Sequence, residues 1–187
     1  MWRTPEEYRN LIDSLPPDHR ERGKFFSAVV REGMGRVTAD FTNLIKPSGF
    51  QRRRKTLWWF RKHDVTMDIV GVHRSGSYYG GAPNNASVDL RMMLSIAVLD
   101  GTEPENHVGG DYSDHLRKPS GGLYHFRFNA ITGSMYDRCV EDMMAWLNDF
   151  AEPWFAKHRG AALLRHPDIA PETAARLRAL LQQNGGL

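Results

Sequence analysis

Two segments with alternating apolar and polar residues carry side chains that could hold an anionic ligand. In 86–98 and 124–130 an apolar residue stands at every second position, which is the period of a β-strand with one buried face. The residues between them would share the other face, where arginine forks suit carboxylate and phosphate groups. The sequence therefore predicts a ligand-binding sheet face with Asp89, Arg91, Ser95, His125, Arg127 and Asn129, joined by Arg61 and Asp68 from earlier strands.

The same residues also fit a solvated sheet face that binds nothing, because opposite charges on neighbouring strands pair across a sheet. Register decides which face they occupy, since a slip of one residue would turn these side chains into the core. Two glycine-rich segments, 75–85 and 108–122, lie between the strands and add three aromatic candidates, Tyr78, Tyr79 and Tyr112.

A basic and aromatic stretch, SGFQRRRKTLWWFRK at 48–62, could bind nucleic acid. Its cations would contact phosphates while a tryptophan stacks on a base, as in proteins that bind single strands. The residues of this alternative are Arg52, Arg53, Arg54, Lys55, Trp58 and Trp59.

We favour a β-hairpin for this stretch, with 49–53 and 57–62 as short strands and 54–56 as the turn. Trp58 and Phe60 would then lie on one face and Trp59 and Arg61 on the other, so both tryptophans could not stack on one ligand. The charges would lie at an exposed tip or edge, where they discourage pairing with other strands.

Motifs for metal binding and catalysis are weak. His107, Asp111, Asp114 and His115 supply oxygen and nitrogen donors, but neither a cysteine pair nor an HExxH pattern accompanies them, and we predict no metal and no cofactor. Cys139 lies early in an expected helix, where the helix dipole could lower the pKa of its thiol, yet its apolar neighbours indicate packing.

An enzyme of unknown class, with a site around His73, Asp89 and His125, remains an alternative, although we lean towards a protein that is not an enzyme. The chain contains none of the GxSxG, GxGxxG or GxxxxGK[ST] patterns.

Composition indicates one ordinary globular domain. The 187 residues are 41% hydrophobic and 25% charged, with a net charge of +3 that does not by itself indicate a nucleic-acid protein. One cysteine excludes an internal disulfide, and no apolar run reaches the length of a signal sequence or a membrane span. We therefore expect a cytoplasmic protein with no membrane partner.

The order of elements predicts an α+β fold in two layers. Helices are expected over 5–14, from Phe25 to Ile45, from Ser134 through a break at Pro153, and from Pro171. An antiparallel meander of about four to six strands lies between them, with helices on one face. We expect a polar segment at 1–24, one domain at 25–160, and a terminal helix at 161–187 that packs on the domain or extends from it.

Part of the chain resembles a family of small bacterial proteins catalogued only as a domain of unknown function. The likeness lies in a helix exit, Leu44-Ile45-Lys46-Pro47-Ser48-Gly49-Phe50, followed by basic residues and the strand Trp58-Trp59-Phe60-Arg61. It continues through Val70–His73 and Val88–Val98, and it covers roughly 30–155. The resemblance supports the fold and implies no activity.

We therefore predict a small non-enzymatic binding module. It would engage a protein partner or a small anionic ligand through the polar sheet face and the loops that contain Tyr78 and Tyr79. Nucleic acid is the less favoured partner.

Overall fold

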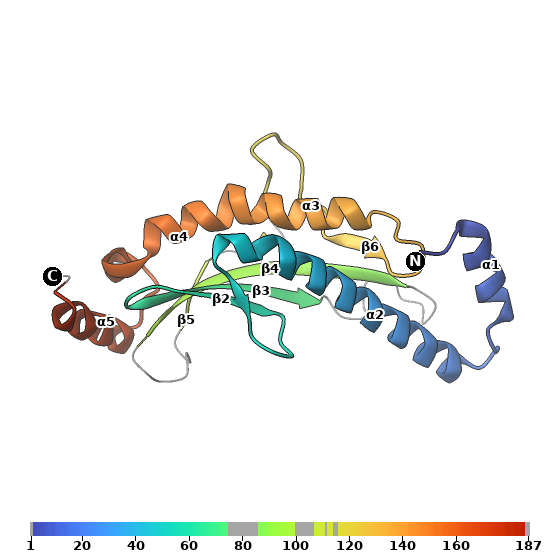
Figure 1. Cartoon of the computed structure of the whole chain (residues 1–187), viewed down its shortest axis with the longest axis horizontal. Coiled ribbons are helices and arrows are strands. Elements are labelled where there is room, and N and C mark those ends of the chain that lie inside the picture. Colours follow the sequence, from blue (N-terminus) through green and yellow to red (C-terminus); the bar gives the residue numbers. More distant parts are fainter. Residues whose placement is uncertain (1, 75–85, 100–106, 111, 114–115, 186–187) are drawn as a thin grey trace.

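The computed structural model describes residues 2–74, 86–99, 107–110, 112–113 and 116–185, which form an antiparallel sheet with helices against one face (Figure 1). The chain begins with α1 (Pro5–Ser14), α2 (His19–Ile45) and the 3₁₀ turn η1 (Lys46–Ser48). The strands are β1 (Gln51–Arg52), β2 (Trp58–Lys62), β3 (Thr66–Arg74), β4 (Ser87–Val98), β5 (His107–Gly109) and β6 (Arg127–Asn129). The helical segments that follow are α3 (Tyr136–Trp146), the π-helical η3 (Leu147–Ala151), α4 (Glu152–His158), the 3₁₀ segment η4 (Gly160–Arg165) and α5 (Pro171–Gln183).

The sheet is a meander in the order β1-β2-β3-β4-β5, and β6 also pairs with β4. β5 runs beside 95–97 and β6 beside 87–89, so the two short strands share one edge of the long strand β4. Neither reaches Met92 at the middle of that edge. There the backbone N–H of Met92 donates to the Oγ of Ser113 at 2.9 Å, so a side chain supplies the hydrogen-bond acceptor for this backbone group.

Alternation along β4 gives the sheet one face towards the helices. The apolar positions of this face are fully or almost fully buried: Val88, Leu90, Met92, Leu94, Ile96 and Val98. On β2 the same face carries Trp59, whose Nε1 donates to Thr42 Oγ1 of α2 at 3.0 Å and whose ring meets Phe41 edge-on. The predicted α+β class, with an antiparallel sheet and helices on one face, is confirmed.

Helix α2 crosses this face with an apolar stripe at three- and four-residue spacing. The stripe is buried at Phe26, Val30, Gly33, Val37, Phe41 and Ile45. A Cβ atom on Gly33 would lie 2.8 Å from the Cβ of Ala130, so the close crossing of helix and strand requires glycine. The helix begins earlier than the apolar pattern, because Asp18 caps it by accepting from the N–H groups of Arg20 and Glu21 at 2.7 and 3.1 Å.

Three local predictions differ from the structure. Ser134 does not cap α3: the helix begins at Tyr136, after Met135 in a left-handed conformation (φ 65°), without a side-chain cap. Pro153 neither ends nor sharply breaks the helix, because the π-helical turn η3 precedes it and Pro153 lies in the first turn of α4. The last strand covers only Arg127–Asn129, although the flanking residues still bond to the β4 segment: the Phe126 carbonyl accepts from Leu90 N–H at 2.9 Å, and Ala130 N–H donates to the Ala86 carbonyl at 2.8 Å.

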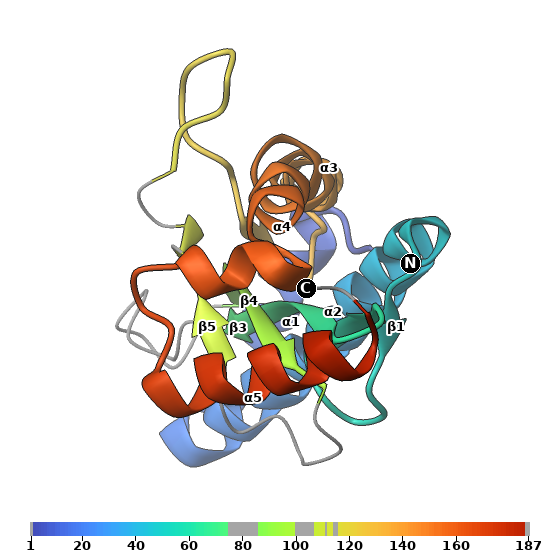
Figure 2. The ribbon, with the colours of Figure 1, turned by 90° about the vertical axis from the view of Figure 1, so that its left-hand side faces the viewer.

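The two ends of the chain pack on opposite parts of the fold. Helix α1 lies beside the first half of α2, and its residues Tyr8, Leu11 and Ile12 contact a small cluster built on Phe26. Helix α5 lies near the end of β4 (Figure 2) and adds Leu177 and Leu181 to the main core. Within the described residues, no helix combines the length and the hydropathy that a membrane crossing requires.

Candidate binding face of the sheet

Polar side chains of three strands meet on the sheet face that points away from the helices. Asp89 lies opposite Arg127, Ser87 opposite Asn129, and Arg91 opposite His73 of β3. Opposed residues and their alternate neighbours share a face, which confirms that the β4 and β6 candidates lie together. We call this group the polar strip; its residues are His73, Ser87, Asp89, Arg91, Arg127 and Asn129.

The accessible groups of the polar strip lie at its two edges. Arg127 and His73 are exposed, whereas the residues between them are half-buried. Nη2 of Arg127 donates to Ser87 Oγ at 3.2 Å, which is the one hydrogen bond of this guanidinium within the described residues. Asn129 has a structural task instead: its Oδ1 accepts from the N–H groups of Ile131 and Thr132 at 2.9 and 3.0 Å, which forms the turn after β6.

Arg91 lies at the centre of the polar strip beside an aromatic ring. Its guanidinium carbon is 5.6 Å from the ring centroid of Tyr112, within the range of a cation–π contact. Tyr112 itself is 53% exposed. The pair therefore offers a cationic and a flat apolar surface at the same place.

His125 lies two residues before the start of β6, and its backbone is hydrogen-bonded to helix α3. Its backbone N–H donates to Oδ2 of the buried Asp142 at 2.6 Å, and Asp142 also accepts from Lys118. The Nε2 of His125 is buried and finds no hydrogen-bond partner among the described residues. His125 thus lies next to the polar strip, but its backbone position is fixed by α3.

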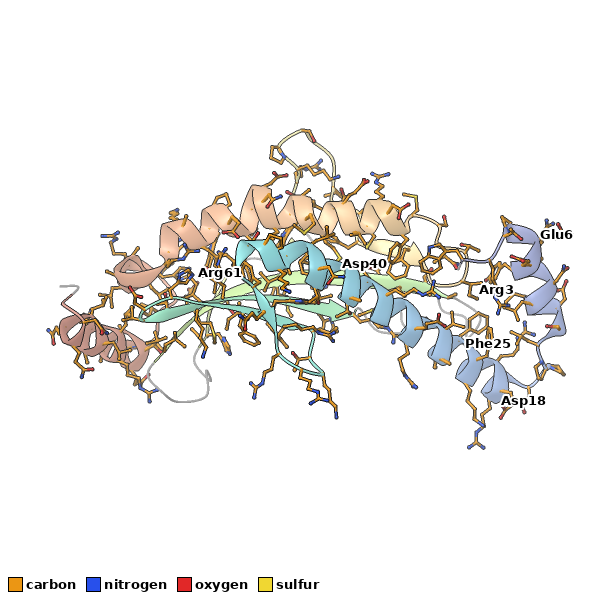
Figure 3. The ribbon with its side chains drawn as sticks, in the orientation of Figure 1. Arg3, Glu6, Asp18, Phe25, Asp40 and Arg61 are labelled. Carbon is orange, nitrogen blue, oxygen red and sulfur yellow. The ribbon has the colours of Figure 1, made fainter. Side chains whose placement is uncertain are left out.

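Arg61 and Asp68 do not belong to the polar face, which corrects their predicted position. They lie opposite each other on β2 and β3, in the same alternation as Trp59 and Val70, and therefore face the helices. Asp68 is fully buried, and Arg61 lies between the sheet and α4 (Figure 3). The sequence signal was the period of two, which places Arg61 on the same face as Trp59, and the structure shows that this tryptophan is buried.

Asp68 is the centre of a buried charged cluster that also contains Arg61, His63, Glu152 and Arg159. Its Oδ2 accepts from Arg61 at 2.8–3.0 Å and from Arg159 at 2.6 Å, and it lies 2.8 Å from Nε2 of His63. Arg61 also donates to both oxygens of Glu152 at 2.7 Å and to the Ser48 carbonyl at 3.0 Å. Sequence reasoning missed Glu152 and Arg159 as partners, because they lie far along the chain in the α4 region.

The partners within the buried charged cluster satisfy one another. Burial acts to lower the pKa of Arg61, but its hydrogen bonds and charge interactions with Glu152 and Asp68 outweigh burial and raise it. The guanidinium also stacks over Phe50 at 4.3 Å. Two arginines face two carboxylates, and these contacts hold α4 and η4 against the sheet.

The face of the polar strip is not polar along its whole length. At the β2–β3 side and the end of β4, Met67, Ile69 and Ala97 are buried and contact Phe60 and Leu99. Ser95, predicted as a polar-face residue, lies in this part and is only 8% exposed. The candidate site is therefore limited to the half of the face around β6.

The basic and aromatic stretch at 48–62 forms a β-hairpin, the interpretation that we favoured from the sequence. β1 and β2 pair through Gln51 with Phe60 and Arg52 with Trp59. Trp59 is fully buried and cannot stack on a base, and Trp58 packs across Gly71, where a Cβ would meet its ring at 2.4 Å. The cations Arg52, Arg53, Arg54 and Lys55 are exposed.

The remaining candidates carry no site in the described part of the chain. Tyr78, Tyr79, Asp111, Asp114 and His115 lie outside the described residues. Within the described ranges, no group of three or more His, Cys, Asp or Glu side chains could hold a metal ion. Burial, then the charges of Asp142 and Asp89, raise the pKa of the Cys139 thiol to about 12, so it packs as a protonated thiol.

Comparison with known proteins gives no relative. No family model, no curated protein and no solved structure matches the chain. The resemblance to the bacterial family therefore stays a prediction.

Proposed function

We propose that the chain is a small binding module that takes an anionic group of a protein partner or a small ligand on the polar strip. The observation that supports this is the register of β4 and β6, which pairs Arg127 with Asp89 and leaves Arg91 at the next position on the same face. Diagonal neighbours of this kind lie roughly 7–8 Å apart, so two guanidinium groups can approach one carboxylate or phosphate.

Charge within the polar strip favours an anion over a cation. Arg91 and Arg127 outnumber the single acid Asp89, and His73 lies directly opposite Arg91. Asp89 offsets part of the repulsion between the arginines, which keeps both cations close together before a ligand binds. Tyr112, beside Arg91, adds an exposed ring against which an apolar part of the ligand could pack.

The test is a titration of the protein with glutarate, inorganic phosphate and a hexaglutamate peptide, followed by backbone amide NMR shifts. We expect shifts centred on β4 and β6, and a loss of affinity of roughly tenfold or more in the Arg91→Ala/Arg127→Ala variant. Increasing salt should weaken binding, because the strip lies at the surface.

Arg74→Ala is the matched control. Arg74 is an exposed arginine at the end of β3, one residue after His73 and therefore on the opposite face. Its removal changes the net charge by the same amount per residue and should leave the titration unchanged. Equal binding by the parent and the double variant, or an equal loss in the control, would exclude the polar strip as the site.

A further inference from the structure

A groove of about 440 Å³ lies between α2 and α3, on a part of the molecule that the polar strip does not reach. Figure 3 labels Asp40 on its α2 wall. The lining contains three carboxylates and no basic residue: Asp40, Asn43, Leu44, Tyr136, Asp137, Val140 and Glu141.

The carboxylates of this acidic groove form no ion pair among those that the structure describes. Asp40 accepts a hydrogen bond from the Tyr136 hydroxyl at 2.5 Å, and none of the described ion pairs includes Asp40, Asp137 or Glu141. Leu44, 46% exposed, adds apolar surface to the groove. A complementary surface would therefore present cations around a short aliphatic contact.

The same chain carries such a surface at the tip of the β1–β2 hairpin. Arg53 N–H donates to the Trp58 carbonyl at 3.1 Å and Thr56 N–H to the Arg53 carbonyl at 3.2 Å, which closes a tight turn with Arg54 and Lys55 at its apex. Nε of Arg52 donates to the Thr56 carbonyl at 2.7 Å, and Thr56 Oγ1 donates to the Arg53 carbonyl at 2.8 Å. The basic tip is thus held in one shape before any contact is made.

Lys55 occupies an unusual backbone position in this tip. Its φ is 64°, in the left-handed region that glycine adopts without strain and a lysine does not. A glycine would suit the turn better, so the lysine places a cation at the apex at a cost in stability.

We propose that the basic tip of one copy docks into the acidic groove of a second copy, and that the contact is reciprocal. The hairpin and the C-terminal half of α2 lie on the same side of the molecule, facing the viewer in Figure 1 and on the right in Figure 2. The hairpin extends away from α3, towards the lower edge of both views, so each tip can meet the groove of a second copy, and a two-fold axis between two copies makes the two contacts equivalent. The resulting dimer is closed and depends on charge.

Sedimentation velocity of the full chain over a range of concentrations measures this association. We expect a dimer at about 50 mM salt that dissociates at about 500 mM, where charges are screened within a few ångströms. The tip variant Arg54→Glu/Lys55→Glu and the groove variant Asp137→Lys/Glu141→Lys should each raise the dissociation constant by roughly tenfold or more.

The decisive experiment mixes the tip variant with the groove variant. In the mixture the reversed tip meets the reversed groove, and the unchanged tip meets the unchanged groove, so a mixed dimer should form although each variant alone is a monomer. Lys55→Gly should also weaken association while the midpoint of thermal unfolding holds or rises, because the backbone strain is relieved. This single variant keeps the test valid if Asp137→Lys weakens the first turn of α3.

The matched control is Glu172→Lys/Arg178→Glu, which reverses two exposed charges on α5 and should leave association unchanged. A monomer under every condition would overturn the proposal. So would a dimer that neither reversal weakens, or a basic tip that retains single-stranded DNA while the protein stays monomeric.

Discussion

The buried charged cluster and the polar strip contain the same kinds of residue on opposite faces of one sheet. In the buried charged cluster, Asp68 is fully buried, and Arg61, Glu152 and Arg159 supply charges that balance within the protein. In the polar strip, Arg127 is exposed and has one described hydrogen bond, to Ser87. Arginine and aspartate can therefore form a balanced cluster in the interior or an exposed group on the surface of the same sheet.

The difference also separates what each region does for the protein. Removing a partner from the buried charged cluster leaves charges in the interior, which is expensive. Removing Arg127 from the polar strip leaves an already exposed position in contact with water. Stability and binding measurements should consequently respond to opposite sets of variants.

The largest effect is expected for Asp68→Ala. Loss of this carboxylate leaves Arg61 and Arg159 facing each other without their shared acceptor, and we expect the free energy of unfolding to fall by roughly 3–5 kcal/mol. Chemical denaturation measures it, with exposed Asp64→Asn as a control that should change stability by less than about 0.5 kcal/mol. A small loss for Asp68→Ala would mean that the cluster is not a structural unit.

A smaller effect is expected for Glu152→Gln. The side chain is 31% exposed, so solvent screens part of its interaction with Arg61, and we expect a loss of about 1 kcal/mol. The same denaturation experiment, repeated at high salt, should reduce the difference from the parent chain. A loss as large as that of Asp68→Ala would show that Glu152 is the more important carboxylate and would reverse the proposed hierarchy within the cluster.

The smallest effect on stability is expected for Arg127→Ala. This residue is exposed and donates one long hydrogen bond, so the free energy of unfolding should change by no more than about 0.5 kcal/mol. Thermal unfolding of parent and variant in the same buffer is sufficient. A loss above about 2 kcal/mol would place Arg127 among structural residues and remove the contrast with the buried charged cluster.

Sequence periodicity predicted the parts of the fold in which one face is clearly buried. The stripe of α2 and the alternation of β4 are long enough to define faces, and they correctly placed Asp89 and Arg91 beside Arg127. The separation of Trp58 from Trp59 followed from the same period of two. In each case local spacing and the burial of apolar residues act together.

Periodicity was wrong where a strand is buried on both faces. In β3 every residue from Thr66 to Val72 is buried, so the polar side chains of Thr66 and Asp68 gave a false signal of a solvated face. Asp68 tolerates burial because Arg159, far along the chain, supplies a charge. No local pattern contains that partner, and the same is true of Glu152.

The edge of β4 shared by β5 and β6 has an evolutionary consequence. At Met92, between the two short strands, the backbone N–H of β4 donates to the hydroxyl of Ser113, which belongs to the segment between β5 and β6. The pairings of β4 with β5 and with β6 do not involve the other residues of that segment. Its outer part, which includes the exposed turn at 119–122, can therefore lengthen, shorten or accept a grafted peptide while the register of β4 is preserved. New specificity could be added beside the polar strip without rebuilding the sheet.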